Sequence, residues 1–415
     1  MGHFFLNEVQ YLMITVKQRF LSFLTMLAQP KVLIGIVVFI ALGISLQSIF
    51  QGTRFIAGGE YTHYNNYLIF KQSFFHLIES KDVYGAYPKE HFDYFKYSPT
   101  FALLFGMFAY LPDIIGLSFW NLCNLLALVF ALISLPNLKT KWLASIFLLS
   151  IFEIITTTQN EQSNALMLAL FIFTFSSLER KKYFLAACFI GLAIYTKLYA
   201  IVGLSLFLLY PNRIKNMAYL TMVMTALFCL PLLVVEWSQL IFQYKSWLNL
   251  LSLEHDQIYG ISVMGWLHTW FSLSINKFIP VIVGVLLFCL ALFQFKKYQF
   301  KQYRLWMLCS VLIWVVIFNH RAESASYIIA YVGICLWFVT SPINRFTILL
   351  MGFSFILVTL SPTDLFPRIW REQLVQKYTL KAVPVMIVWI ALLVQMIRPI
   401  DHSIQEIDGE LNKLK

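Results

Sequence analysis

The feature that most constrains this chain is a succession of long apolar runs, separated by short basic loops and by one long polar loop. A run of roughly 17 to 25 apolar residues is long enough to cross the hydrocarbon core of a membrane as a helix. A chain with 60% hydrophobic and 12% charged residues does not suit the surface of a soluble protein. The sequence therefore predicts an all-α polytopic membrane protein.

We expect about twelve transmembrane helices in a single transmembrane domain that covers residues 1–415. The apolar run 99–111 ends at Leu-Pro-Asp, and it is predicted to be a re-entrant or tilted half-helix. Amphipathic helices are expected in the polar loop 51–99, where apolar residues recur every three or four positions. The predicted crossings are residues 33–50, 115–135, 142–158, 162–178, 183–197, 199–211, 216–235, 276–295, 305–319, 324–341, 346–361 and 380–398.

The basic residues predict which side of the membrane each loop occupies. If residues 99–111 do not cross, the Lys and Arg clusters of the short loops all fall on one side, which the positive-inside rule assigns to the cytoplasm. The N-terminal segment 1–32 and the tail 399–415 are then cytoplasmic. The loops 51–99 and 236–275 are then extracytoplasmic, and we expect the protein to reside in the plasma membrane of a bacterium, that is, the inner membrane.

Several classes of function lack their sequence signatures. The net charge of +11 comes from short basic clusters, which anchor helices to membrane lipids, so no nucleic acid partner is expected. The six cysteines all lie inside apolar runs, as core residues do. The chain has no P-loop, no C-x-x-C or H-E-x-x-H metal motif and no G-x-S-x-G elbow. We therefore expect no metal and no other cofactor, and an enzyme of this kind would need an activated substrate.

Three acids of the loop 51–99 are candidate general bases. Glu60 follows the first predicted crossing by about ten residues, where partial desolvation would raise the pKa of its carboxyl group toward the range of a base. The alternative is a solvated loop acid or a charge at a helix N-terminus. Asp82 and Asp93 are rival bases, although short acids in loops commonly serve as turn or capping residues.

Three cationic or hydrogen-bonding groups predict a phosphate site. Lys197, His320 and Arg321 lie at the ends of predicted crossings, where ionisable residues are costly and call for an explanation. Ammonium, imidazole and guanidinium groups all bind phosphate oxygens. The structural alternative is that Arg321 and Glu323 form an ion pair with each other or extend to the membrane interface.

Neutral polar groups gather at the turn between the predicted crossings 142–158 and 162–178. Four side-chain amides within six residues exceed what helix capping requires, and amides are good partners for sugar hydroxyls. We expect substrate contacts from this turn and from nearby polar loop residues. The predicted contacts are His63, Tyr64, Asn65, Tyr97, Gln159, Gln162, Asn164 and Glu323.

Short motifs suggest a family. A carboxylate soon after the first span, the Asp82-Val83-Tyr84 element, the aromatic-Tyr-x-Pro entry at residues 95–99, the Gln162-Ser163-Asn164 turn and Lys197 beside Tyr199 occur in that order. In this, the chain resembles the multi-spanning C-type glycosyltransferases (GT-C), and more narrowly glycosyltransferase family 87. Members of that family include polyprenyl-phosphate-mannose-dependent mannosyltransferases.

The resemblance implies an inverting transfer of a mannose-like hexose from a polyprenyl-phosphate sugar donor. The acceptor would be a lipid-linked or cell-surface glycan on the extracytoplasmic face. In the family a first-loop Asp with a Tyr four residues later acts as the base. The matching pair here is Glu60 and Tyr64, with Glu in place of Asp, so Asp82 and Asp93 remain candidates.

Two other functions fit the same sequence. A transporter or flippase for a lipid-linked or anionic substrate would also place charges within the membrane, but these should lie near the bilayer centre and accompany an internal repeat. An oligosaccharide transferase resembling O-antigen ligases would use the loop 236–275, which contains Glu254, His255 and Asp256.

Overall fold

Helices account for nearly all of the regular structure in the computed structural model, which describes residues 18–19, 21–56, 59–136, 138–255, 259–273 and 276–399. Most of the predicted segment 1–32 and of the tail 399–415 lies outside these residues. The helices of the apolar runs are α2 (Pro30–Phe50), α6 (Asp113–Ser134), α7 (Thr140–Leu149), α8 (Ile151–Gln159), α9 (Asn164–Glu179), α10 (Tyr183–Thr196), η1 (Leu198–Leu209), α11 (Arg213–Cys229), η2 (Leu230–Leu233), α14 (Phe278–Leu292), η3 (Phe295–Lys297), α15 (Lys301–Ile317), η4 (Ser324–Ser326), α16 (Tyr327–Thr340), α17 (Arg345–Ser354), η5 (Phe355–Leu360) and α19 (Ala382–Ile397).

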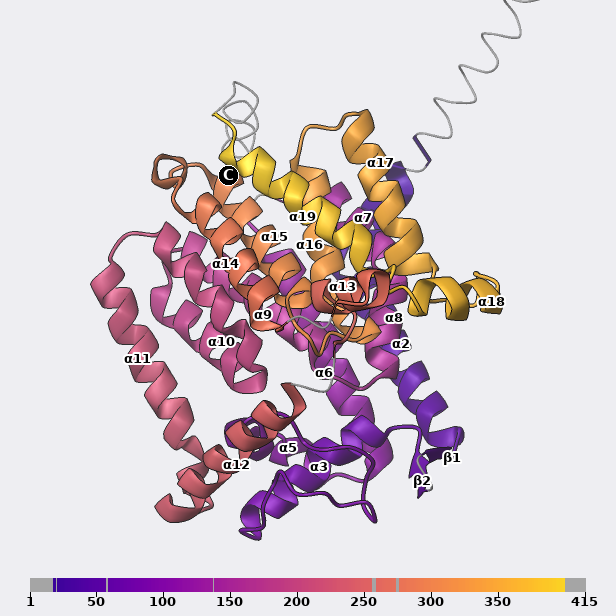
Figure 1. The fold of residues 1–415 in the computed structure, drawn as a ribbon, viewed down its shortest axis with the longest axis vertical. Helices are drawn as coiled ribbons and strands as arrows, with labels where there is room; N and C mark the ends of the chain where they lie inside the picture. Colours follow the sequence, from indigo (N-terminus) through magenta and orange to yellow (C-terminus); the bar gives the residue numbers. More distant parts are fainter. Residues whose placement is uncertain are drawn as a thin grey trace, which may run out of the picture.

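The centre of the bundle is formed by α9, α15 and α16, which contact one another (Figure 1). Nearly every residue of these three helices is buried, including Trp306 and Trp337. A helix that is apolar on all sides is stable only when other helices surround it. The helices α2 and α6 pair along one side of this centre, and α10 and α11 pair along another.

Every apolar run predicted to cross the membrane is helical over most of its length. The run 142–158 is divided between α7 and α8, whose axes differ by 51°. Within the described residues, three helices are long and apolar enough to cross alone, or four if the bent pair forms one span. The structure is thus compatible with an all-α membrane protein. The count of about twelve crossings stays a prediction, because the other apolar helices have only 10–17 residues.

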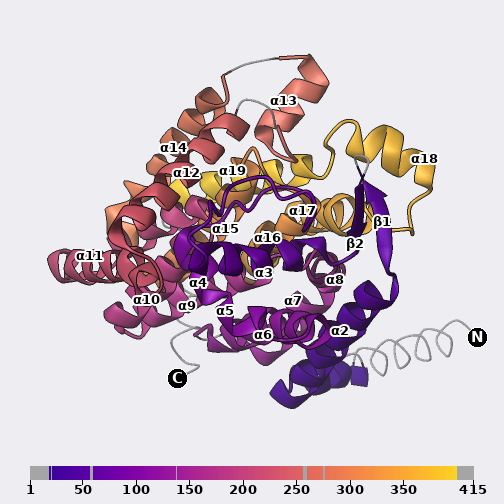
Figure 2. The ribbon, with the colours of Figure 1, turned by 90° about the horizontal axis from the view of Figure 1, so that it is seen from below.

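The polar loop 51–99 forms a separate packed unit with α4 (Pro99–Leu104), α5 (Gly106–Ala109) and α12 (Trp237–His255). This unit lies at the lower end of Figure 1, and Figure 2 shows α3 (Asn65–Ile78), α4 and α5 side by side. Its core is aromatic. The ring of Phe70 packs edge to face against the rings of Phe101 and Phe105, with a distance of 5.4 Å between ring centres in each case. Such pairs add to the stabilisation from burial alone.

The run 99–111 contains two short helices instead of one long one. Ser98 caps the first helix by accepting a hydrogen bond from the backbone N–H of Phe101 at 3.1 Å, and Pro99 occupies the first helical position. Residues 99–109 would span about 16 Å as a helix, roughly half of the hydrocarbon core. The segment is therefore too short to cross alone, and its re-entrant placement stays a prediction.

The sequence predicts only helices in the loop 51–99, whereas the structure also contains an antiparallel hairpin. Strands β1 (Thr53–Ile56) and β2 (Gly59–Thr62) pair with Phe55 opposite Glu60. Thr, Ile, Phe and Tyr residues favour strands, and they fill most of these positions. The hairpin is too short to give a clear alternating pattern in the sequence. The remaining connecting elements are α13 (Val263–Phe271), α18 (Arg368–Trp370) and η6 (Arg371–Gln376).

A buried ion pair, which the sequence analysis does not anticipate, ties α8 to the start of α19 and to η4. The Lys381 Nζ lies 2.9 Å and 3.1 Å from the two carboxylate oxygens of Glu153, and it donates to Ser324 Oγ at 2.9 Å. The two charged side chains are only 3% and 1% exposed. This contact fixes the position of η4, which directly follows Glu323.

Removal of one partner of this pair should destabilise the protein strongly. We expect Lys381→Met to lower the free energy of unfolding by about 3–5 kcal/mol, because the Glu153 carboxylate is left buried without a counter-charge. Denaturant unfolding in detergent micelles measures the effect. The double variant Glu153→Gln/Lys381→Met should recover most of the loss, and Arg368→Ala, which breaks an exposed pair with Glu372, should change nothing measurable. Unchanged stability of Lys381→Met would contradict the structural role.

Candidate functional site

A chain of hydrogen bonds connects four of the predicted site residues. Lys197 lies in the extended break between α10 and η1, and its Nζ donates to Asn164 Oδ1 at 2.7 Å. The Asn164 Nδ2 donates to Gln162 Oε1 at 2.9 Å, and the Gln162 Nε2 donates to Glu323 Oε2 at 2.8 Å. We call this chain the Lys197 network. It has a cation at one end and a carboxylate at the other, with two amides between them.

Tyr97 supports the cationic end of this network. The ammonium group of Lys197 lies 5.4 Å from the centre of the Tyr97 ring, which is buried and stacks on Phe101 at 4.6 Å. A cation is attracted to the face of an aromatic ring, and more strongly where water is excluded. The Tyr97 hydroxyl also accepts a hydrogen bond from Ser163 Oγ at 3.3 Å. The aromatic ring therefore helps to hold Lys197 beside the turn that carries Gln162 and Asn164.

His320 and Arg321 lie in the connection between α15 and η4, directly before Glu323. The backbone N–H of Arg321 donates to Asn319 Oδ1 at 3.0 Å, and its Nη2 donates to the Leu251 carbonyl at 3.4 Å. The carboxylate of Glu323 accepts from Gln162, and no Arg321–Glu323 ion pair is formed among the described residues. The predicted ion pair is thus not observed, and the interfacial placement of the two side chains stays a prediction.

A polar cavity of about 360 Å³ lies next to the Lys197 network. Its volume falls within the range of about 300–1,000 Å³ that is typical of small-molecule sites. Four predicted site residues line it, namely His63, Asn65, Asp93 and Gln159. Elements α2, α3, α8 and the β hairpin supply half of its lining residues. In Figure 2 the hairpin, α2 and α8 lie toward the same side of the molecule. The other lining residues are Gln47, Ser48, Gln51, Arg54, Asn66, Phe92, Asn160 and Glu161.

The turn between α8 and α9 belongs to both features. Gln159, Asn160 and Glu161 line the polar cavity, whereas Gln162 and Asn164 are members of the Lys197 network. The turn is held in place by the amide of Asn66, which donates to the Asn160 carbonyl at 2.8 Å. A ligand that filled the cavity would therefore touch residues adjacent to the cationic network.

The three predicted bases occupy different surroundings. Glu60 is exposed on β2, and its carboxylate accepts a hydrogen bond from Thr53 on β1; the desolvation expected for it near the membrane stays a prediction. Asp93 lines the polar cavity, where it forms an ion pair with Lys96 at 2.8 Å. Neither Glu60 nor Asp82 is among the lining residues of that cavity.

Asp82 connects two loops that are far apart in the sequence. One of its carboxylate oxygens accepts from the backbone N–H of Tyr84 at 3.0 Å, which closes a tight turn. Both oxygens lie 2.9 Å from Ser246 Oγ on α12. Around this contact the side chain of Gln243 bonds to the backbone of Lys81 and Val83. The turn role that the sequence analysis names as an alternative for Asp82 is observed.

Two other predicted substrate contacts have structural partners. The Tyr64 hydroxyl donates to Asp113 Oδ2 at 3.2 Å. The Asn65 amide is bonded at both ends to Phe92, donating to its carbonyl and accepting from its backbone N–H, each at 2.8 Å. Asn65 therefore orders the loop that carries Asp93, and only part of its side chain can face the cavity.

Sequence reasoning missed two charged residues of the cavity, Glu161 and Arg54. Glu161 is only 2% exposed, and burial raises the pKa of its carboxyl group well above the usual value. A hydrogen bond from Ser48 and the charge of Arg54 offset part of this rise. The only signal for Glu161 in the sequence is that an acid stands among four amides, and such a pattern is also typical of a solvated polar turn. Within the described residues no three His, Cys, Asp or Glu side chains form a metal cluster, and the absence of a metal stays a prediction.

The loop 236–275 is largely helical, through α12 and α13. Asp256 and the side chains of Glu254 and His255, on which the oligosaccharide transferase hypothesis depends, lie outside the described residues. Helix α12 packs on the loop 51–99, where Trp247 Nε1 donates to the Lys96 carbonyl at 3.0 Å. The backbone N–H of Ile261 donates to the Ala322 carbonyl at 2.7 Å, so this loop also contacts the connection that carries Arg321.

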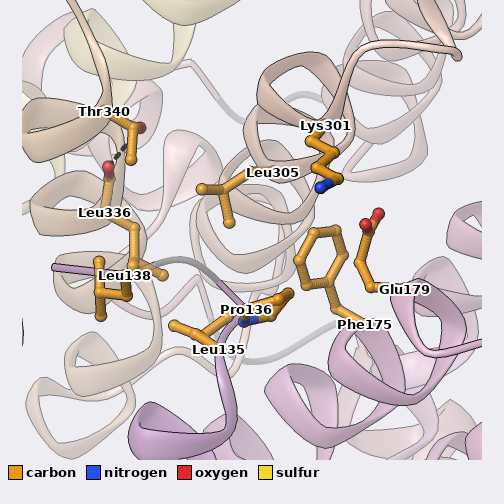
Figure 3. Close-up of a pocket in the computed structure, with 9 residues that line it drawn as sticks. All are labelled: Leu135, Pro136, Leu138, Phe175, Glu179, Lys301, Leu305, Leu336 and Thr340. Atoms are coloured by element: carbon orange, nitrogen blue, oxygen red, sulfur yellow. Dashed lines mark hydrogen bonds between the residues drawn. The ribbon is translucent and has the colours of Figure 1, made fainter. Parts of the chain in front are cut away.

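The opposite end of α9 carries a different polar cluster. The Glu179 carboxylate accepts from Arg304 Nη2 at 2.9 Å and from the Tyr210 hydroxyl at 2.6 Å, which ties α9 to α15 and η1. Figure 3 shows the small cavity beside Glu179, with Lys301 on one side and Leu336 and Thr340 on another. Its volume of about 30 Å³ suits little more than a water molecule. The Glu179 cluster therefore locks helices together.

The Asp82–Ser246 contact generates a stability prediction. We expect Asp82→Ala and Ser246→Ala each to lower the free energy of unfolding by about 1–3 kcal/mol, because a hydrogen bond to a charged group is lost in a partly buried place. The double variant should lose no more than the larger single loss, since both changes remove the same contact. Denaturant unfolding in detergent gives these values. Ser252→Ala, on the exposed side of α12, is the control, and additive losses would argue against the contact.

Comparison with known proteins places these residues in a family. The family model described as glycosyltransferase family 87 matches residues 95–316, which is more than half of the 415-residue chain. No curated protein matches the chain. The matched range includes Tyr97, the turn between α8 and α9 and Lys197. It starts after Glu60, Asp82 and Asp93 and ends before His320. The chain therefore belongs to glycosyltransferase family 87, and the protein is a glycosyltransferase.

Proposed function

We propose that this enzyme transfers a mannose-like hexose, with inversion, from a polyprenyl-phosphate donor to a lipid-linked or cell-surface glycan. The reaction takes place on the extracytoplasmic face, in a bacterial inner membrane. The observation that carries the proposal is the shared turn between α8 and α9, which joins the Lys197 network to the polar cavity. A sugar phosphate needs both kinds of surroundings at once, cations for its phosphate and neutral polar groups for its hydroxyls.

The donor phosphate binds on the cationic side of this turn. Lys197, with His320 and Arg321 of the neighbouring connection, neutralises the charge that develops on the phosphate as it leaves. An acceptor hydroxyl attacks the anomeric carbon while the bond from that carbon to the phosphate oxygen breaks, and the bonding electrons leave with the phosphate. Groups fixed where charge develops usually supply the largest share of catalysis. No nucleotide and no metal is needed, because the donor is already activated.

An apolar cavity suits the lipid part of the donor. Its volume is about 550 Å³, and it is lined by η1, α11, α14 and α15, with residues such as Ile201, Leu204 and Phe288. One of its lining residues, Ile201, lies four positions after Lys197 in the chain. Burial of an isoprenoid chain there would be favoured by the hydrophobic effect. This arrangement supports a lipid-linked donor over a nucleotide sugar.

The sugar hydroxyls bind in the polar cavity. His63, Asn65, Asp93 and Gln159 of the predicted contacts line it, and their hydrogen-bonding groups match those of a sugar. The proposal requires a carboxylate that takes the proton of the acceptor hydroxyl, and the sequence names Glu60, Asp82 and Asp93 for this role. Of these three, Asp93 lies in the cavity.

The role of Lys197 predicts a loss of activity on removal of its charge. We expect Lys197→Met to lower kcat/KM by about 10²- to 10³-fold, because a fixed charge that stabilises the leaving phosphate is lost. The assay uses purified enzyme and a short-chain polyprenyl phosphomannose. The matched control is Lys182→Met, at the exposed opposite end of α10, and it should retain full activity. Full turnover by Lys197→Met would refute the phosphate site.

The extracytoplasmic placement predicts a labelling pattern. Lys89→Cys lies in the exposed part of the loop 51–99, and Lys296→Cys lies in the exposed connection between α14 and α15. On intact cells a membrane-impermeant maleimide should label the first variant above the wild-type background and should label the second only after permeabilisation. The reverse pattern would place the cavity on the cytoplasmic face.

A further inference from the structure

Glu161 occupies a position that is held from two sides. It lies in the turn between α8 and α9 with φ at +48°, a left-handed conformation that non-glycine residues seldom adopt. Its carbonyl accepts a hydrogen bond from Trp120 Nε1 of α6 at 2.6 Å, and its carboxylate accepts one from Ser48 Oγ of α2 at 3.3 Å. These contacts direct the Glu161 side chain into the wall of the polar cavity, which it lines.

The carboxylate of Glu161 has unused hydrogen-bonding capacity. A carboxylate offers about four acceptor sites, and buried polar groups are normally satisfied. Glu161 is only 2% exposed. Among the described residues, Ser48 is the one whose side chain donates a hydrogen bond to the Glu161 carboxylate. An acid that is buried, incompletely hydrogen-bonded and located at a cavity of this size is suited to receive a ligand hydroxyl.

The neighbouring charged groups distinguish Glu161 from the other acids. Arg54, His63 and Asp93 are the titratable residues that line the same cavity. Asp93 is paired with Lys96 and also accepts from the backbone N–H of Tyr94, so its carboxylate is already engaged. Among the described residues Glu161 forms no ion pair, and burial raises the pKa of its carboxyl group well above the usual value, which makes its carboxylate a stronger base.

We propose that Glu161 contacts the acceptor in this cavity and takes the proton of its attacking hydroxyl. The acceptor is a neutral sugar, since Gln47, Gln51, Asn66 and Asn160 supply most of the remaining polar wall. As the new carbon–oxygen bond forms at the anomeric carbon, the hydroxyl proton passes to the Glu161 carboxylate and the lipid phosphate departs with the bonding electrons. This inference rests on the proposed function.

The position of Glu161 in the chain supports this role. It directly precedes Gln162, which is two hydrogen bonds away from the Lys197 ammonium group. The base and the phosphate site are therefore carried by one short turn, so their relative geometry is fixed before substrate binds. Fixing reacting groups in advance removes entropy cost from the reaction.

The test compares matched acid-to-amide variants. In the polyprenyl phosphomannose assay with a neutral glycolipid acceptor, Glu161→Gln should lower kcat by about 10²- to 10⁴-fold, and by more than Glu60→Gln or Asp93→Asn does. The matched control is Glu79→Gln, at an exposed acid that pairs with Lys81, and it should retain wild-type activity. The wild-type rate should rise with pH through the raised pKa of Glu161, and the residual rate of Glu161→Gln should lack that step. Glu161→Asp, which keeps the acid, should recover part of the activity.

Folding and donor binding are measured separately. A carboxyl group whose pKa is raised by folding lowers the stability of the protein once the pH exceeds the pKa of that group in the unfolded chain. At pH 8 Glu161→Gln should therefore have a melting temperature equal to that of wild type or higher. Binding of the polyprenyl phosphate itself should be unchanged, because the Lys197 network is intact.

Two outcomes overturn the proposal in different ways. If Glu161→Gln keeps full turnover while Asp93→Asn or Glu60→Gln loses it, the assignment of the base is wrong and the proposed function stands. If wild-type enzyme transfers no sugar from a polyprenyl phosphate but does so from another donor, the proposed function fails, and the inference that rests on it falls as well.

Discussion

The cost of placing charge beside hydrocarbon determines how this site is built. The charge of Lys197 is compensated by three groups. The amide of Asn164 accepts a hydrogen bond from it, the ring of Tyr97 faces it, and the carboxylate of Glu323 closes the network at the far end. Each of these partners comes from a different part of the chain, so the helices must be in register before the cation is stabilised. The same need for compensation fixes Lys381 beside Glu153. Polar chemistry and helix packing are thus parts of one arrangement.

Much of the architecture could be predicted from hydropathy, because the apolar runs are long and their helical character is a local property. Gln162, Asn164, Lys197 and Glu323 are each predicted as site residues, because polar residues near apolar runs are conspicuous, but the sequence does not predict that they form one hydrogen-bond network. Glu60 and Asp82 were less predictable. Whether a loop acid faces a cavity, a hairpin partner or another loop depends on tertiary contacts that no local pattern encodes.

Glu161 shows why the buried groups were harder to recognise. Its neighbours in sequence are polar, which indicates a solvated turn, yet Trp120 and Ser48 enclose it from two distant helices. The role of Glu153 is equally difficult to predict from the sequence, because its partner Lys381 is 228 positions away. An isolated acid in an apolar run is a weak signal until its counter-charge is known. The structure identifies that counter-charge for Glu153, namely Lys381.

The contact between α12 and the loop 51–99 has a consequence for biosynthesis. The Gln243 side chain that holds the Lys81 backbone is 162 residues further along the chain. During translation the loop therefore emerges from the ribosome long before its cover exists, and more than half of the polypeptide must be synthesised before the two can meet. A ribosome that stalls between them would leave an aromatic surface unprotected, which makes this interval the vulnerable period in the production of the enzyme.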